Sequence, residues 1–202
     1  MRNNFQPLSG IMATAICIFA YLIFSSINAD YSHLTKAFSE LASIGQPNYL
    51  WFAVFGFLIP GLLVTLFSLK LCKWVNNGNV RKYPFILIAL SGLLIALGAS
   101  PMNYENYSSL SSTLHIIGVM GSGLFFIIGA FTISKQLRKD KQWQALVKPL
   151  LICAWLLIIT GFFRQSAFPG LAQKLGILAY YIYIALLSWN AYRIIQLRRT
   201  AI

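Results

Sequence analysis

Side chains that could take part in acid–base chemistry are few in this sequence. Its 202 residues include four acidic residues and two histidines. Ser39 and Glu40 follow the first long apolar run, and His115 stands near the start of the fourth. A histidine exchanges protons near neutral pH, and a carboxylate can share that work in acid–base catalysis. His115 and Glu40 are therefore candidate acid and base groups, with a hydrogen-bonded structural histidine as the alternative.

Two basic side chains, Arg164 and Lys174, stand where the fifth apolar run ends and the sixth begins. An arginine close to hydrocarbon is costly unless it extends to the interface, pairs with an acid or contacts a lipid phosphate. We expect Glu40 to pair with Arg164, and contact of Arg164 with a substrate headgroup is an equal alternative. Lys174 poses the same choice, and we expect it to extend to the interface. The candidate ligand-binding pocket therefore consists of Ser39, Glu40, His115, Arg164 and Lys174.

The acids and histidines do not follow a known metal-binding pattern. A zinc site needs three or four ligands at compatible positions. Asp30, His33, Glu105 and His115 could supply them from two hairpins, but the sequence has no HExxH or HxxxH motif. It also lacks a GxSxG nucleophile motif, a Gly-rich phosphate loop and a haem-attachment motif. We expect no metal and no cofactor.

The elements that must position these residues are long apolar runs. Hydrophobic residues make up 58% of the chain and charged residues 10%, whereas soluble domains carry about 25% charged residues. A helix of about 20 apolar residues crosses a bilayer, and open strands cannot satisfy their backbone in lipid. We predict an all-α polytopic transmembrane bundle, one domain over residues 1–202. Its six helices are expected at Leu8–Asn28, Tyr49–Leu69, Pro84–Ser100, Thr113–Ser134, Pro149–Gln165 and Leu171–Arg193.

The first of these runs is expected to be retained as a helix. A cleavable signal has a shorter apolar region followed by small residues at the cleavage site. A signal anchor cleaved between Asn28 and Ala29 is the alternative.

Basic residues predict the orientation of the bundle. Of the 16 lysines and arginines, thirteen fall at the start of the chain, in the segments 70–82 and 135–148, or in the tail, and three, Lys36, Arg164 and Lys174, fall on the other side. Cytoplasmic loops carry the excess of positive charge, so both termini are expected in the cytoplasm and the candidate pocket on the outer side. Because the basic residues lie in short loops rather than on one solvated face, nucleic-acid binding is not expected despite the formal charge of +12.

The first outer segment and the helix sequences suggest further local features. Leu34, Phe38 and Leu41 have helical spacing within residues 29–48, which favours a short interfacial helix there. Pro60, followed by Gly61, is expected to kink the second helix. Small residues at helical spacing predict close helix packing: Gly92, Ala96 and Ser100 in the third helix, and Gly118 and Ser122 in the fourth.

Short motifs spread over nearly the whole chain resemble a known family. They include Ser39-Glu40-Leu41 after the first helix, Leu114-His115 opening the fourth, and Gln173-Lys174-Leu175 opening the sixth. The sequence is similar to domain-of-unknown-function family 998, a group of bacterial and archaeal six-helix membrane proteins. The resemblance implies this architecture and a location in the cell membrane, and it directs attention to Ser39, Glu40 and His115. It implies no activity.

Three functions are compatible with these features. The first is binding of a lipid or small amphiphile in an outward-facing polar pocket, with membrane lipids as partners. The second is a structural or regulatory membrane subunit, and the third is a membrane-embedded enzyme that acts on lipid headgroups through His115 and Glu40. A channel is disfavoured because no helix carries a spanning row of polar residues. The substrate and the oligomeric state are left open by the sequence.

Overall fold

The computed structural model describes residues 5–200, so Arg2, one of the basic residues used for the orientation, lies outside the described residues. Six long helical segments are present, which confirms the predicted all-α membrane bundle. The second is continuous but divides into α2 (Tyr49–Phe52), a π-helical segment η2 (Ala53–Leu58) and α3 (Ile59–Leu71). The others are α1 (Phe5–Ser26), α4 (Tyr83–Leu97), α5 (Leu110–Leu137), α6 (Val147–Phe162) and α7 (Pro169–Thr200).

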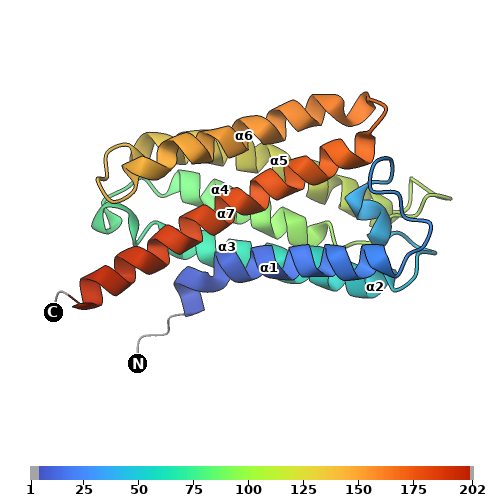
Figure 1. Cartoon of the computed structure of the whole chain (residues 1–202), viewed down its shortest axis with the longest axis horizontal. Coiled ribbons are helices and arrows are strands. Elements are labelled where there is room, and N and C mark those ends of the chain that lie inside the picture. The colour runs from blue at the N-terminus through green and yellow to red at the C-terminus, as the bar shows by residue number, and fades with distance from the viewer. Residues whose placement is uncertain (1–4, 201–202) are drawn as a thin grey trace.

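The helices run side by side and alternate in direction (Figure 1). We call the end of the bundle that holds Phe5 and Thr200 the terminal end. The distal end holds the connecting segments 27–48, 98–109 and 163–168. Neighbouring pairs with extensive packing are α1 with α3, α3 with α4, α4 with α5, α6 with α7, and α7 with α1, while α5 and α6 touch less. The ring of helices is therefore weakest between α5 and α6.

Five of these segments are long and apolar enough to cross a membrane. The exception is α4, whose 15 residues span only about 22 Å at 1.5 Å per residue. Proline occupies the first turn of α4 (Pro84), α6 (Pro149) and α7 (Pro169). Proline costs no hydrogen bond there, because the first-turn N–H groups have no helical acceptor.

Small residues allow close approach of backbones, as predicted. A Cβ atom on Gly61 of α3 would lie 2.5 Å from the backbone nitrogen of Ala96 and from the carbonyl oxygen of Gly92. A Cβ atom on Gly118 of α5 would likewise lie 2.5 Å from the nitrogen of Gly98. The α3–α4 and α4–α5 contacts therefore both require glycine.

The irregularity expected at Pro60 takes the form of the π-helical segment η2. Proline has no N–H to donate to Gly56, four residues earlier, and its ring would crowd that carbonyl in a regular helix. A wider turn relieves this conflict. Gly56 and Phe57 of η2 border a pocket inside the bundle.

The distal segment 27–48 contains a short helix, η1 (Phe38–Ala42), which is of the 3₁₀ type. Phe38 and Leu41 are buried, but Leu34 lies outside η1 and is exposed. The segment is fixed to the start of α7, where the Leu171 N–H donates to the Leu34 carbonyl over 3.0 Å. A Cβ atom on Gly170 would collide with the carbonyl of Lys36, so this contact also depends on glycine.

Candidate functional site

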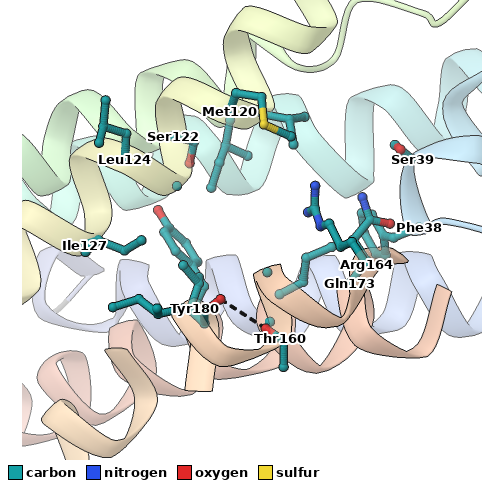
Figure 2. Close-up of a pocket in the computed structure, with 18 of the residues that line it drawn as sticks. Phe38, Ser39, Met120, Ser122, Leu124, Ile127, Thr160, Arg164, Gln173 and Tyr180 are labelled. Carbon is teal, nitrogen blue, oxygen red and sulfur yellow. Dashed lines mark hydrogen bonds between the residues drawn. The ribbon is translucent and has the colours of Figure 1, made fainter. Parts of the chain in front are cut away.

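A pocket of about 560 Å³ lies inside the distal half of the bundle, between α5 on one side and α6 and α7 on the other. Figure 2 shows Met120, Ser122, Leu124 and Ile127 of α5 facing Thr160, Gln173 and Tyr180 across it. Most of the lining is apolar, and its polar side chains are few. They are Ser39, Ser122, Thr160, Arg164, Gln173, Tyr180 and Tyr181.

The pocket is open where α5 and α6 separate. Gly123 of α5 and Gly161 of α6 both border it, and a Cβ atom on either would meet no atom within 4 Å. Phe162, at the same opening, is 81% exposed. Toward the terminal end the two helices close together through Phe131 and Trp155, whose rings lie 5.4 Å apart. The opening therefore faces the side of the bundle, where lipid would lie, in its distal half.

Aromatic residues close the pocket toward the terminal end. The ring of Tyr180 lies 4.5 Å from that of Phe126, and its hydroxyl is 3.0 Å from the Ser91 hydroxyl of α4. Beyond it, the Tyr183 hydroxyl donates to the Ala130 carbonyl. These contacts link α7 to α4 and α5 and close the pocket on the side of the terminal end.

The distal end of the pocket is polar. Arg164 and Gln173 lie there beside Phe38 and Ser39 (Figure 2). Gln173 is only 8% exposed, and its Oε1 accepts the Phe38 backbone N–H over 2.6 Å. Because the oxygen must face that N–H, the amide group Nε2 is turned away from it. The amide therefore has donor capacity that this hydrogen bond does not use.

Arg164 lies in a single 3₁₀ turn, Phe163–Gln165, that continues α6. Its side chain is half-buried and extends into the pocket (Figure 2). Within residues 5–200 it makes no hydrogen bond or ion pair. The predicted pairing with Glu40 is absent from the described part of the chain.

Glu40 instead stabilises the segment in which it lies. Its Oε1 accepts the Ala37 backbone N–H over 2.6 Å, which caps the start of η1. Glu40 is not among the residues that line the pocket, whereas its neighbour Ser39 is. Burial raises the pKa of Tyr104 in the next distal segment, and the negative charge of Glu40 raises it further.

His115 is 4% exposed and also lies outside the pocket lining. Its Nδ1 donates to the Ser100 carbonyl over 3.0 Å, and its ring packs edge-on against Phe57 at 5.6 Å. This hydrogen bond fixes the start of α5 to the segment that follows α4. His115 and Glu40 therefore each serve a different backbone group, and the structure does not bring them together in the pocket.

Lys174 is directed at the segment 27–48 rather than at the pocket. Its Nζ donates to the carbonyls of Lys36 and His33 over 2.5 and 3.0 Å and lies 4.9 Å from the centre of the Tyr31 ring. Burial raises the pKa of Tyr31, so its hydroxyl stays protonated and donates to the Ala37 carbonyl over 3.0 Å. Lys174 thus neutralises carbonyl dipoles where the segment meets α7.

The two histidines are each hydrogen bonded to a protein group. His33 Nδ1 is hydrogen bonded to the Tyr21 hydroxyl over 2.5 Å, and His115 is bonded as described above. In the part of the chain that the structure describes, no three His, Cys, Asp or Glu side chains are grouped closely enough to hold a metal ion.

Two residues of the pocket lining, Ser39 and Arg164, were predicted from the sequence, and the other lining residues were not. Gln173, Gly176 and Tyr180 share one face of α7 at spacings of three and four residues. On α5, Val119, Gly123 and Ile127 border the pocket at a spacing of four residues, with Ser122 beside them. Such faces mix small and polar residues within apolar helices and are a usable signal, but ordinary helix packing in membranes produces the same pattern.

The bundle defines a polytopic helical membrane protein with a pocket between its helices. A family model described as "Protein of unknown function (DUF998)" matches residues 11–190. The chain therefore belongs to domain-of-unknown-function family 998. Comparisons with curated proteins and with solved structures gave no match.

Proposed function

We propose that the protein binds a lipid or small amphiphile in the pocket between α5, α6 and α7. Ligand sites in proteins are commonly concave, mostly apolar and about 300–1,000 Å³ in volume, with a few polar groups that orient the ligand. The volume of about 560 Å³ and the few polar side chains in a mostly apolar lining match this description. The lateral opening at Gly123 and Gly161 is the observation that carries the proposal, because it admits a molecule from the bilayer.

The proposal includes the orientation and location of the bundle. The basic loops favour a cytoplasmic terminal end, which would place the pocket in the outer leaflet of a bacterial or archaeal cell membrane. A ligand would then enter from the leaflet that faces outward.

The other two functions have less support. A purely structural subunit needs no cavity, so the pocket argues against it. An enzyme that uses Glu40 and His115 would need both side chains near one ligand, yet each is hydrogen bonded to a backbone group outside the pocket lining. Ligand binding is therefore the function that the geometry supports best.

The substitution Gly161→Phe tests the proposal. The space beside Gly161 is empty, so the new ring should occupy the opening without displacing a neighbour. We expect purified wild-type protein to retain an amphiphile in native mass spectrometry and the variant to lose it. The matched control is Leu93→Phe, which enlarges a side chain of α4 that is exposed and outside the pocket lining.

Equal retention of amphiphile by Gly161→Phe and wild type, with both proteins folded by size-exclusion chromatography, would contradict binding in this pocket. Failure of wild-type protein to retain any amphiphile would contradict the proposed function itself.

A further inference from the structure

At the polar end of the pocket, two side chains have hydrogen-bond donors that are not paired with a protein acceptor. The Arg164 guanidinium faces the cavity with no protein partner among residues 5–200. The Oε1 atom of Gln173 is held by the Phe38 N–H, which leaves the amide hydrogens of Nε2 for another group. Both side chains belong to the described lining, and no aspartate or glutamate is part of it. The distal end of the pocket is therefore positively charged and offers hydrogen-bond donors that no described side chain or backbone group engages.

An unpaired arginine at the edge of hydrocarbon carries a large desolvation cost. Snorkelling to water would relieve this cost, but Figure 2 shows the side chain extending into the cavity beside Gln173. An anionic group there would supply the missing counter-charge. It would also accept hydrogen bonds from the guanidinium, which suits the planar geometry of a carboxylate and the oxygens of a phosphate.

We propose that the pocket is selective for anionic amphiphiles, with Arg164 and the Gln173 amide binding a carboxylate or phosphate headgroup. The hydrocarbon chain of the ligand then lies against Leu124, Ile127, Leu157 and Ile158 and leaves through the opening between α5 and α6. This selectivity rests on the proposed function, because it specifies the chemical class of the ligand in the same pocket.

The experiment uses native mass spectrometry to measure how tightly the purified protein binds four probes. Each probe has a twelve-carbon chain, and the probes differ in their headgroups. The probes are laurate, lauryl phosphate, lauryl alcohol and lauryl trimethylammonium. We expect the two anions to bind wild-type protein about tenfold or more tightly than the alcohol, which is the scale of one hydrogen bond to a charged group. The cationic probe is expected to bind least.

Two substitutions separate the headgroup site from the cavity. Arg164→Gln removes the charge, and we expect it to reduce binding of both anions about tenfold while binding of lauryl alcohol stays unchanged. Gln173→Glu keeps an oxygen for the Phe38 N–H but replaces the amide donor with a second negative oxygen beside Arg164. It should therefore also abolish the preference for anions without releasing the segment 27–48 from α7.

Arg164→Lys serves as the conservative control, because it keeps the charge and should retain part of the preference. In a further measurement, inorganic phosphate is added to the protein together with laurate. We expect it to leave laurate binding unchanged, and displacement of laurate by phosphate at equal concentration would overturn the assignment of an amphiphile in favour of a free anion.

Equal affinity of wild-type protein for laurate and lauryl alcohol, or an anion preference that survives in Arg164→Gln, would overturn the selectivity and leave the pocket intact as a lipid site. The Gly161→Phe variant tests the cavity and not the headgroup site. Loss of lauryl alcohol binding in this variant therefore supports binding in the pocket, whether or not the pocket is selective for anions.

Discussion

Lys174 and Arg164 are ten residues apart in the sequence, and both lie at the distal end of the bundle. Their charged groups have different environments. The Lys174 ammonium is surrounded by backbone carbonyls and the Tyr31 ring, whereas the Arg164 guanidinium faces a cavity. A charge that is already hydrogen bonded by the protein contributes to stability, and a charge left without a partner is available for a ligand. Only the second of these two residues is placed to recognise one.

Lys174→Met should therefore reduce stability rather than binding. The substitution keeps most of the aliphatic chain but removes the donor to the carbonyls of Lys36 and His33. We expect a loss of about 1–3 kcal/mol, the usual cost of leaving partly buried acceptors without a charged donor. Thermal unfolding in detergent, followed by circular dichroism, measures this loss.

The control for Lys174→Met is Lys36→Met, because Lys36 contributes its carbonyl and not its side chain to this contact. A Lys174→Met variant as stable as Lys36→Met would contradict the structural role assigned to Lys174.

Glu40 gives a second test at the residue scale. The carboxylate accepts one backbone N–H at the start of η1, and glutamine can accept the same bond through its amide oxygen. We expect Glu40→Gln to be close to wild type in thermal stability and Glu40→Ala to lose about 0.5–2 kcal/mol, as at helix caps. Equal losses in the two variants would show that the negative charge, and not the hydrogen bond, is what matters.

At the scale of elements, α5 shows how glycine serves two purposes on one helix. The Cβ of an alanine at position 118 would lie 2.5 Å from the backbone of Gly98, but at position 123 it would face open space. Gly118 is therefore needed for packing of α5 against α4, while Gly123 leaves room for a ligand. Gly118 and Gly123 are thus five residues apart on one helix, and only position 123 has space for a larger side chain.

We expect Gly118→Ala to destabilise the protein by about 1–3 kcal/mol, because the backbones must move apart. Gly123→Ala should be neutral or stabilising by up to about 1 kcal/mol, because alanine favours helix over glycine. The two variants can be compared by thermal unfolding in the same detergent. A destabilised Gly123→Ala would indicate that α5 and α6 are in contact where the structure shows an opening.

Helix positions could be predicted from the sequence, but most of the pocket could not. Apolar length located all six helices, because a spanning helix has to satisfy its backbone internally. Their ends agree to within three residues, except that α7 continues to Thr200, seven residues beyond the predicted Arg193. The pocket depends on how three helices separate. In the sequence this leaves only helix faces of small and polar residues, which ordinary helix packing also produces. Arg164 was found because a charge near hydrocarbon is rare, whereas Gln173 and Tyr180 resemble ordinary residues of a helix face.

At the scale of the whole molecule, the bundle is asymmetric in charge. Lys70, Lys82, Lys135 and Arg198 belong to the terminal end, and its single acidic residue, Asp140, accepts the Asn76 backbone N–H over 2.6 Å. At the distal end, Lys174 is engaged by carbonyls. Positive charge in short loops is retained on the cytoplasmic side during insertion.

We expect fluorescence from a green fluorescent protein fused after Thr200, since that reporter folds in the cytoplasm. Alkaline phosphatase inserted after Leu34, in the distal segment, should be active, because it requires an oxidising compartment. The exchanged fusions serve as controls, and phosphatase activity at the C-terminal position would invert the assigned orientation.

The lateral opening between α5 and α6 has a consequence for how affinity should be expressed. A ligand that enters from the bilayer equilibrates with the lipid around the protein and not with the aqueous phase. Occupancy would then follow the mole fraction of the ligand among membrane lipids, and two amphiphiles of equal affinity in water would compete according to how strongly each partitions into the leaflet. Changing the lipid composition at constant aqueous concentration would therefore change occupancy, even though no residue of the protein had been altered.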